Sequence, residues 1–152
     1  MAFFTILPLL VISPLLPTGT NADAGRWEYH YVESEKLHKL LYFESGARHG
    51  VIYFRCEAAE GWAKVTLASR KGRTRENVLF QSGVNTVSAP VRTALDTGSE
   101  TLLINTVVPV NHPVLQAMAG GAALVVEGAS YPVATEQEKL SVGSFIEACD
   151  DQ

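Results

Sequence analysis

Short runs in which apolar and polar residues alternate dominate the chain and predict β-strands. Residues 26–32 alternate aromatic with polar side chains, which is typical of a strand with one buried face. Residues 50–56 are rich in β-branched and aromatic side chains, and parity places Ile52 and Phe54 on the same face as Cys56. Further strands are expected at residues 62–68, 78–80, 94–95, 101–104 and 123–126.

Turn residues separate these runs. Residues 58–61 and 96–99 each predict a hairpin turn, because small and polar residues there lie between apolar runs. Residues 84–91 alternate only loosely. Residues 35–43 fit either a strand or a short helix, and the run of apolar residues before a Gly-containing turn favours a strand.

Two segments have helical patterns. Asn111 is placed to cap a short helix over residues 112–119, which Gly120 and Gly121 would end. Thr135 and Glu138 form a capping-box pattern, followed at helical spacing by Val142, Phe145, Ile146 and Cys149. The sequence therefore predicts a mostly β, β-sandwich-like domain with a short helix near 112–119 and a C-terminal helix.

The N-terminal segment predicts export. Residues 2–17 contain no charged side chain, and Ala22-Asp23-Ala24 fits a signal-peptidase site. We therefore expect a signal peptide over residues 1–24 and a single domain over residues 25–152, periplasmic or secreted. The absence of Lys or Arg before Arg26, and three prolines in the apolar run, leave a buried segment or an uncleaved anchor as alternatives. The run is shorter than the roughly 20 residues of a membrane-spanning helix, so no membrane span is expected after processing.

Two cysteines allow only one intramolecular disulfide. Cys56 ends the most apolar strand, and Cys149 lies on the apolar stripe of the terminal helix, so both are expected to face one core. An oxidising compartment would favour their pairing, and the disulfide would tie the terminal helix to the sheet. The alternative is a pair of buried free thiols in a cytosolic protein.

Charge restricts the class of partner. The net charge is −4, and removing residues 1–24, whose only charged side chain is Asp23, leaves −3. Such a domain has no electrostatic attraction for nucleic acid, so we expect another envelope or secreted protein as partner. The one basic cluster is a candidate anion-binding or partner patch, or simply a solvated turn; it consists of Arg70, Lys71, Arg73 and Arg75.

Neither catalysis nor metal binding is expected. Asp96-Thr97-Gly98-Ser99 resembles the active-site turn of aspartic proteases, but that chemistry needs two such aspartates and the chain has one copy. A hairpin turn uses the same residue types. His30, Glu28 and His38 could meet in space, although their spacing matches no metal-binding motif, and no cofactor is expected.

The order of these features resembles a known group. An early tryptophan, a strand ending in Phe54-Arg55-Cys56, a helix–glycine–strand unit over residues 114–126 and a terminal helix with Phe145 and Cys149 follow an apolar leader. This order is similar to that of small periplasmic proteobacterial proteins around invasion-associated locus B protein and the type VI secretion accessory VasI. Gly143 is the only glycine close to the position where the group has one before its last helix. The resemblance implies an exported β-sandwich accessory or binding protein without known catalysis.

Three function classes follow. The leading one is an exported, non-catalytic binding or accessory protein of the bacterial cell envelope. The second is a small aspartic-type hydrolase that uses Asp96. The third is an inhibitor or immunity-type protein for a secreted enzyme, a role that suits a small acidic domain with a disulfide.

Export makes a direct prediction about the N-terminus. When the chain is expressed with its own N-terminal segment in an exporting bacterium, we expect the periplasmic protein to begin at Gly25. N-terminal sequencing of the periplasmic fraction measures this. Recovery of the chain with Met1 intact from the cytoplasm would contradict the predicted compartment.

Overall fold

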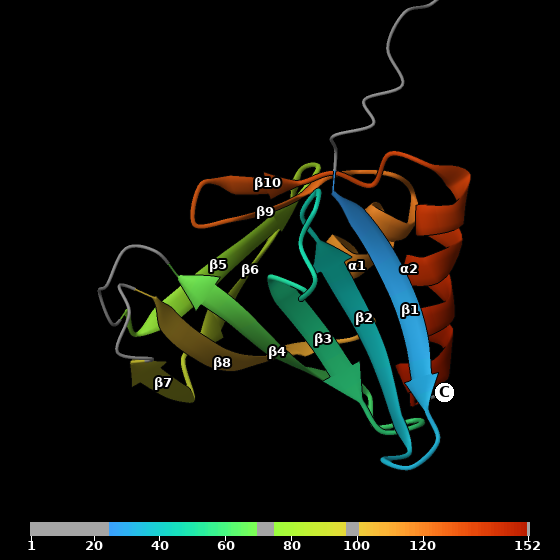
Figure 1. Cartoon of the computed structure of the whole chain (residues 1–152), viewed down its shortest axis with the longest axis horizontal. Helices are drawn as coiled ribbons and strands as arrows, with labels where there is room; N and C mark the ends of the chain where they lie inside the picture. The colour runs from blue at the N-terminus through green and yellow to red at the C-terminus, as the bar shows by residue number, and fades with distance from the viewer. Residues whose placement is uncertain (1–24, 70–74, 97–100, 152) are drawn as a thin grey trace, which may run out of the picture.

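Over the residues that the structure describes, the chain forms two antiparallel sheets and two helices (Figure 1). The structure is a computed structural model, and it describes residues 25–69, 75–96 and 101–151. The elements, in order, are β1 (Arg26–Val32), β2 (Leu37–Phe43), β3 (Ile52–Cys56), β4 (Trp62–Ser69), β5 (Asn77–Ser82), β6 (Asn85–Pro90), β7 (Thr93–Asp96), β8 (Leu102–Pro109), α1 (Pro113–Ala119), β9 (Leu124–Val126), β10 (Ala129–Tyr131) and α2 (Glu136–Cys149). The prediction of a mostly β, sandwich-like domain with two helices is confirmed.

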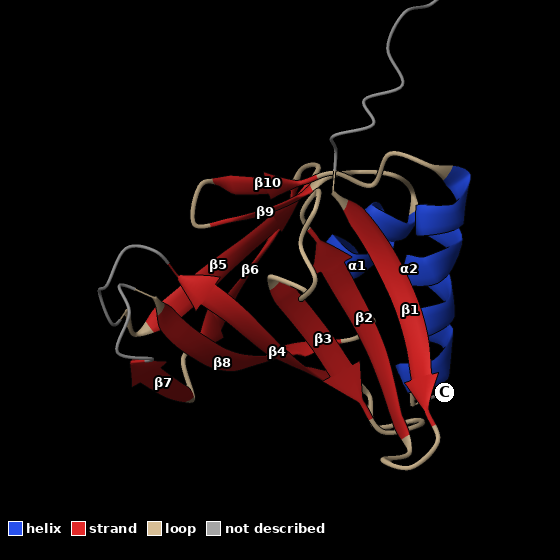
Figure 2. Cartoon of the chain, viewed as in Figure 1, coloured by secondary structure: helices blue, strands red, loops and turns tan. Residues whose placement is uncertain are grey.

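The larger sheet has six strands in the order β1-β2-β3-β4-β8-β7, and the smaller has four in the order β10-β9-β5-β6. Figure 2 shows β5, β6 and α1 behind the larger sheet, and α2 alongside β1. Phe54 of β3 packs against both covering elements. The centroid of its ring lies 6.4 Å from the ring centroid of Phe80 in β5 and 6.3 Å from that of Phe145 in α2. One face of the larger sheet is therefore covered partly by the smaller sheet and partly by α2.

Strand alternation determines which residues enter this core. Ile52, Phe54 and Cys56 are buried, as parity predicted. β8 alternates in the same way but continues to Pro109, beyond the expected end at residue 104. The strand continues because it pairs with β4 as far as Pro109. The polar Thr106 is accommodated on the core face because its buried hydroxyl donates a hydrogen bond of 2.7 Å to the carbonyl of Pro90.

Two local details differ from the sequence-based expectation. The helix predicted over residues 112–119 is present as α1, but its N-cap is His112 and not Asn111, since His112 Nδ1 accepts a hydrogen bond from the Val114 N–H.

Strand β10 was not predicted. It pairs with β9 across Glu127 and Gly128, which both have positive φ. That geometry makes a tight two-residue hairpin turn. The first turn residue in such hairpins is usually asparagine, aspartate or glycine, and here it is a glutamate, so the sequence pattern did not predict the turn.

The capping box of α2 is confirmed and reaches beyond the helix. The Glu138 Oε2 atom accepts hydrogen bonds from the Ala134 N–H, the Thr135 N–H and the Thr135 hydroxyl, at 2.8 to 3.0 Å. The other oxygen, Oε1, accepts one from the Trp27 N–H of β1 at 3.1 Å. Glu138 is only 5% exposed, so this buried carboxylate fixes the start of α2 against β1.

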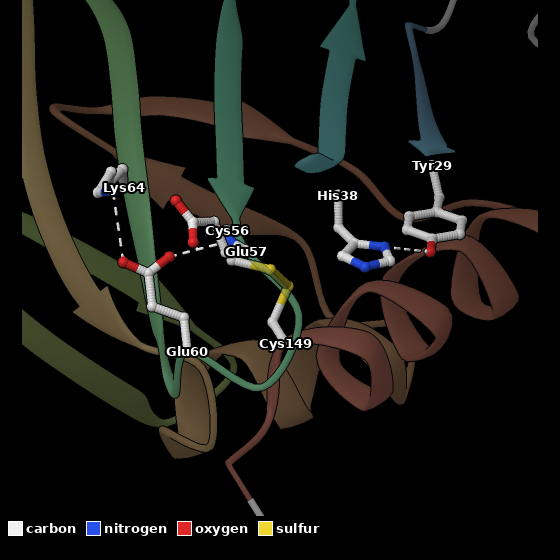
Figure 3. Close-up of a disulfide and its surroundings, with 7 residues drawn as sticks. All are labelled: Tyr29, His38, Cys56, Glu57, Glu60, Lys64 and Cys149. Carbon is white, nitrogen blue, oxygen red and sulfur yellow. Dashed lines mark hydrogen bonds and ion pairs between the residues drawn. A yellow bond between two sulfur atoms is a disulfide. The ribbon is translucent and has the colours of Figure 1, made fainter. Parts of the chain in front are cut away.

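The opposite end of α2 is held by the disulfide between Cys149 and Cys56 (Figure 3). The two Cα atoms lie 5.9 Å apart, and both side chains are buried. The turn between β3 and β4 adds hydrogen bonds from the Ala59 and Gly61 N–H groups to the carbonyls of Ala148 and Cys149. The predicted disulfide and its role in tying the terminal helix to the sheet are confirmed.

The predicted signal peptide, residues 1–24, lies outside the described residues. Within the described ranges, none of the helices has the length and apolar character that crossing a membrane requires.

The disulfide closes a loop between positions 93 apart in the sequence, so its removal should increase the entropy of the unfolded chain. We expect the Cys56→Ala/Cys149→Ala double variant to lose about 2–5 kcal/mol of the free energy of unfolding. Denaturant unfolding of the oxidised protein and the variant measures the loss. The reduced wild-type protein serves as control and should unfold close to the variant. Two titratable thiols in denatured, unreduced wild-type protein would contradict the prediction.

Candidate functional site

Three basic side chains lie in line across the outer face of the larger sheet. The strand register pairs Lys39 of β2 directly with Arg55 of β3, and Arg55 directly with Lys64 of β4. Their sequence neighbours on these strands, such as Phe54 and Ala63, are buried, so the three basic residues point to the opposite, solvent-facing side. We call Lys39, Arg55 and Lys64 the cationic row.

This arrangement is unfavourable for the isolated fold. Neighbouring strands are about 4.8 Å apart, and like charges at directly opposite positions destabilise a sheet. The protein carries a net charge of −4, so three aligned cations do not reflect a general excess of basic residues. The row is therefore a local feature that the fold stabilises against its own electrostatic repulsion.

Acidic neighbours balance the two ends of the row and not its centre. Lys39 pairs with Glu35 at 2.6 Å, and Lys64 pairs with Glu60 at 3.3 Å. Glu60 also accepts the Glu57 N–H, which fixes its position in the β3–β4 turn (Figure 3). Over the described ranges, no ion pair or hydrogen bond involves the Arg55 side chain. The uncompensated positive charge is thus centred on Arg55.

Charge at the β1 end of the sheet is likewise compensated. His30 pairs with Lys39 in the strand register, and its Nε2 lies 3.0 Å from Glu28 Oε2. Partial burial acts to raise the pKa of Glu28, but hydrogen bonds from Arg26 and His30, together with their charges, outweigh it and lower the pKa below its usual value. Glu28 is therefore ionised at neutral pH and offsets the positive charge next to it.

A shallow hollow of about 300 Å³ lies beside the centre of the row. Arg55, Lys64 and Arg92 contribute to its walls, together with Thr93 and Asn105. The Arg92 N–H donates to the Asn105 carbonyl at 2.9 Å, which places Arg92 next to the row. The Asn105 side chain accepts a hydrogen bond from Thr66 and donates one to Thr93, so the polar side of the hollow is braced across three strands. Two arginines thus line one hollow, and arginine side chains can bind carboxylates in a bidentate manner.

Aromatic side chains accompany the cations on this face. Tyr53 and Arg55 are two residues apart on β3, and Trp62 and Lys64 are two apart on β4, so each pair shares the outer face. Trp62 is 51% exposed. Arginine, tyrosine and tryptophan are enriched at the energetic centres of protein–protein interfaces. The face thus has the composition of a surface that binds protein.

The basic cluster predicted from the sequence is elsewhere. Arg75 is exposed just before β5, where it lines a different hollow with Leu79 and Glu127 on the smaller sheet. Arg70, Lys71 and Arg73 lie outside the described residues. Of the predicted patch, the structure thus describes only Arg75, which does not join the cationic row.

The other candidate residues are not brought together either. Glu28 and His30 lie on the outer face of the larger sheet, whereas His38 lies on the inner face, opposite Cys56, and contacts the Tyr29 hydroxyl at 2.8 Å. Over the ranges that the structure describes, no group of three or more His, Cys, Asp or Glu residues could hold a metal ion. The Asp96 backbone ends β7, which pairs with β8 as the predicted hairpin requires; residues 97–99 lie outside the described residues.

Comparison with known proteins gives no relative for this chain. No protein-family model matches it, and neither a curated protein nor a solved structure matches it significantly.

The like-charge pairs of the row make a prediction about stability. Arg55→Gln removes two direct like-charge contacts and should raise the free energy of unfolding by about 0.5–1 kcal/mol at low ionic strength. The gain should shrink in 1 M salt, where charges are screened over about 3 Å. Arg48→Gln, in an exposed loop, makes the same charge change away from the row and is the control in denaturant unfolding. An equal gain in both variants would contradict a specific repulsion within the row.

Proposed function

We propose that this chain is an exported, non-catalytic binding protein of the bacterial cell envelope. Its ligand is an acidic surface of another envelope or secreted protein, and the cationic row is the centre of the binding face. The observation that supports this proposal most directly is the cross-strand alignment of Lys39, Arg55 and Lys64.

Export is supported by the chemistry of the cysteines. Disulfides persist in oxidising compartments and are rare in the cytosol. Cys56 and Cys149 are paired, and the charge-free segment at residues 2–17 has the composition of a signal peptide. The order of the strand cysteine, the α1–β9 unit and the cysteine-bearing α2 also agrees with the resemblance to the locus B and VasI-like periplasmic proteins.

Binding to an acidic protein surface is supported by the energetics of the row. An aligned set of cations costs stability in the free protein, and carboxylates from a partner would convert the repulsion into attraction. The flanking Trp62 and Tyr53 would contribute apolar contact area next to the charges. A protein ligand is favoured over a small anion because the exposed aromatic groups extend the surface beyond the hollow.

A synthetic deca-glutamate peptide tests the proposal. We expect the oxidised protein to bind it at low salt, and Arg55→Gln to weaken binding by at least about tenfold, since a charge-assisted hydrogen bond contributes about 1.5–3 kcal/mol. Arg48→Gln is the control and should bind like the wild type. Isothermal titration calorimetry at two salt concentrations measures the affinities.

Two results would contradict the proposal. Equal binding by Arg55→Gln and the wild type would place the acidic ligand away from the row. If a sulfated glycan such as heparin binds at the row and deca-glutamate does not, the ligand is a polysaccharide and not an acidic protein surface.

A further inference from the structure

A groove of about 530 Å³ runs between β1 and α2, at the opposite end of the larger sheet from the hollow of the cationic row. Every residue from 25 to 30 lines it on the strand side. Side chains of a strand alternate between its faces, so a pocket on one face would be lined by every second residue only. Lining by consecutive residues shows that the groove follows the edge of β1.

Beyond Trp27, the outer edge of β1 has no backbone partner among the residues that the structure describes. Within that part of the chain, β1 is the first strand of the sheet and pairs with β2 alone. The Trp27 N–H points away from β2, because it donates to Glu138 of α2. In an antiparallel ladder, outward-facing residues alternate, so the N–H and C=O groups of Tyr29 and Tyr31 point the same way. No hydrogen bond joins these backbone groups to another described residue.

One face of α2 forms the opposite wall. Gln137, Glu138 and Ser141 line the groove at the spacing of one helix face, and Ala134 and Thr135, just before α2, continue the wall. Figure 1 shows α2 running beside β1 with the strand edge turned toward it. The Glu138 carboxylate occupies the position of a ladder partner at Trp27, so the part of the strand edge that is open to a partner begins at Tyr29.

The width of the groove is fixed in the free protein. At its start α2 is joined to β1 through Glu138, and at its end it is joined to β3 through the disulfide. Between these points Phe145 packs on Phe54 in the core. A groove that is preformed in this way avoids most of the ordering cost of binding.

We propose that this groove binds an extended segment of a partner polypeptide, which adds to β1 as a further strand. An unpaired strand edge presents N–H and C=O groups at the spacing at which an extended backbone offers the complementary acceptors and donors. Tyr29 lines the groove, and Tyr31 lies just beyond its end on the same strand edge. Main-chain hydrogen bonds to these two residues would hold the segment, and its alternate side chains would contact the α2 wall. This site uses different residues from the cationic row and does not depend on the function proposed for it.

The probe is a soluble strand-forming peptide, acetyl-Lys-Thr-Val-Thr-Val-Thr-Lys-amide, titrated into the oxidised full-length protein. We expect amide NMR shifts centred on Tyr29 and Tyr31 and slower hydrogen exchange at these two amides. Tyr29→Pro removes one edge-facing N–H without removing a bond of the β1–β2 ladder, and should weaken binding by about tenfold. Tyr29→Ala is the matched control, because it loses the same ring but keeps the N–H.

A second pair of variants tests the groove without altering β1. Gln137 is exposed on the α2 wall, so Gln137→Trp should fill the groove and abolish binding, whereas Gln137→Ala should bind like the wild type. Unchanged binding by both Tyr29→Pro and Gln137→Trp, or shifts at another strand edge such as β7, would overturn the proposal. Concentration-dependent shifts at Tyr29 without peptide would identify a second copy of this chain as the occupant instead.

Discussion

The attachment of α2 to the larger sheet is the constraint on which the rest of the structure depends. The helix covers the part of the sheet that the smaller sheet leaves open, and three contacts of different chemistry hold it there. A buried carboxylate fixes its first turn to β1, aromatic rings pack along its middle, and a disulfide fixes its last turn to β3. The core, the groove beside β1 and the position of the β3–β4 turn all follow from this attachment.

Three consecutive residues of β3 show how one strand serves separate purposes. Phe54 points inward and contacts rings from both the smaller sheet and α2. Arg55 points outward and is the centre of the cationic row, and Cys56 points inward again to the disulfide. Alternation of side chains therefore places Arg55, the residue proposed to bind a partner, between two buried core positions. Such a residue has a well-fixed backbone, which is what a specific charged contact requires.

The features that could be predicted from the sequence were those defined by local pattern. The capping box at Thr135 and Glu138 and the parity of Ile52, Phe54 and Cys56 needed only neighbouring residues, and both are present. Strand β10 was missed because its turn uses Glu127 at a positive φ, where asparagine or glycine is the usual signal. The cationic row was missed because Lys39, Arg55 and Lys64 are aligned only by strand register, which side-chain pattern alone does not define. The second role of Glu138, as a partner for β1, depends on a contact across 111 positions of the chain.

The order of the elements along the chain has a consequence for how the molecule is made. Every strand precedes α2, and Cys149 follows Cys56 by 93 positions. A polypeptide that emerges with its N-terminus first therefore presents β1 to β10 before either the Glu138 carboxylate or the second cysteine exists to fasten them. Throughout this interval the part of the inner face that α2 covers in the finished fold remains exposed. The fold is thus closed by its last helix, and the core beneath β1 to β3 cannot be completed before that helix is made.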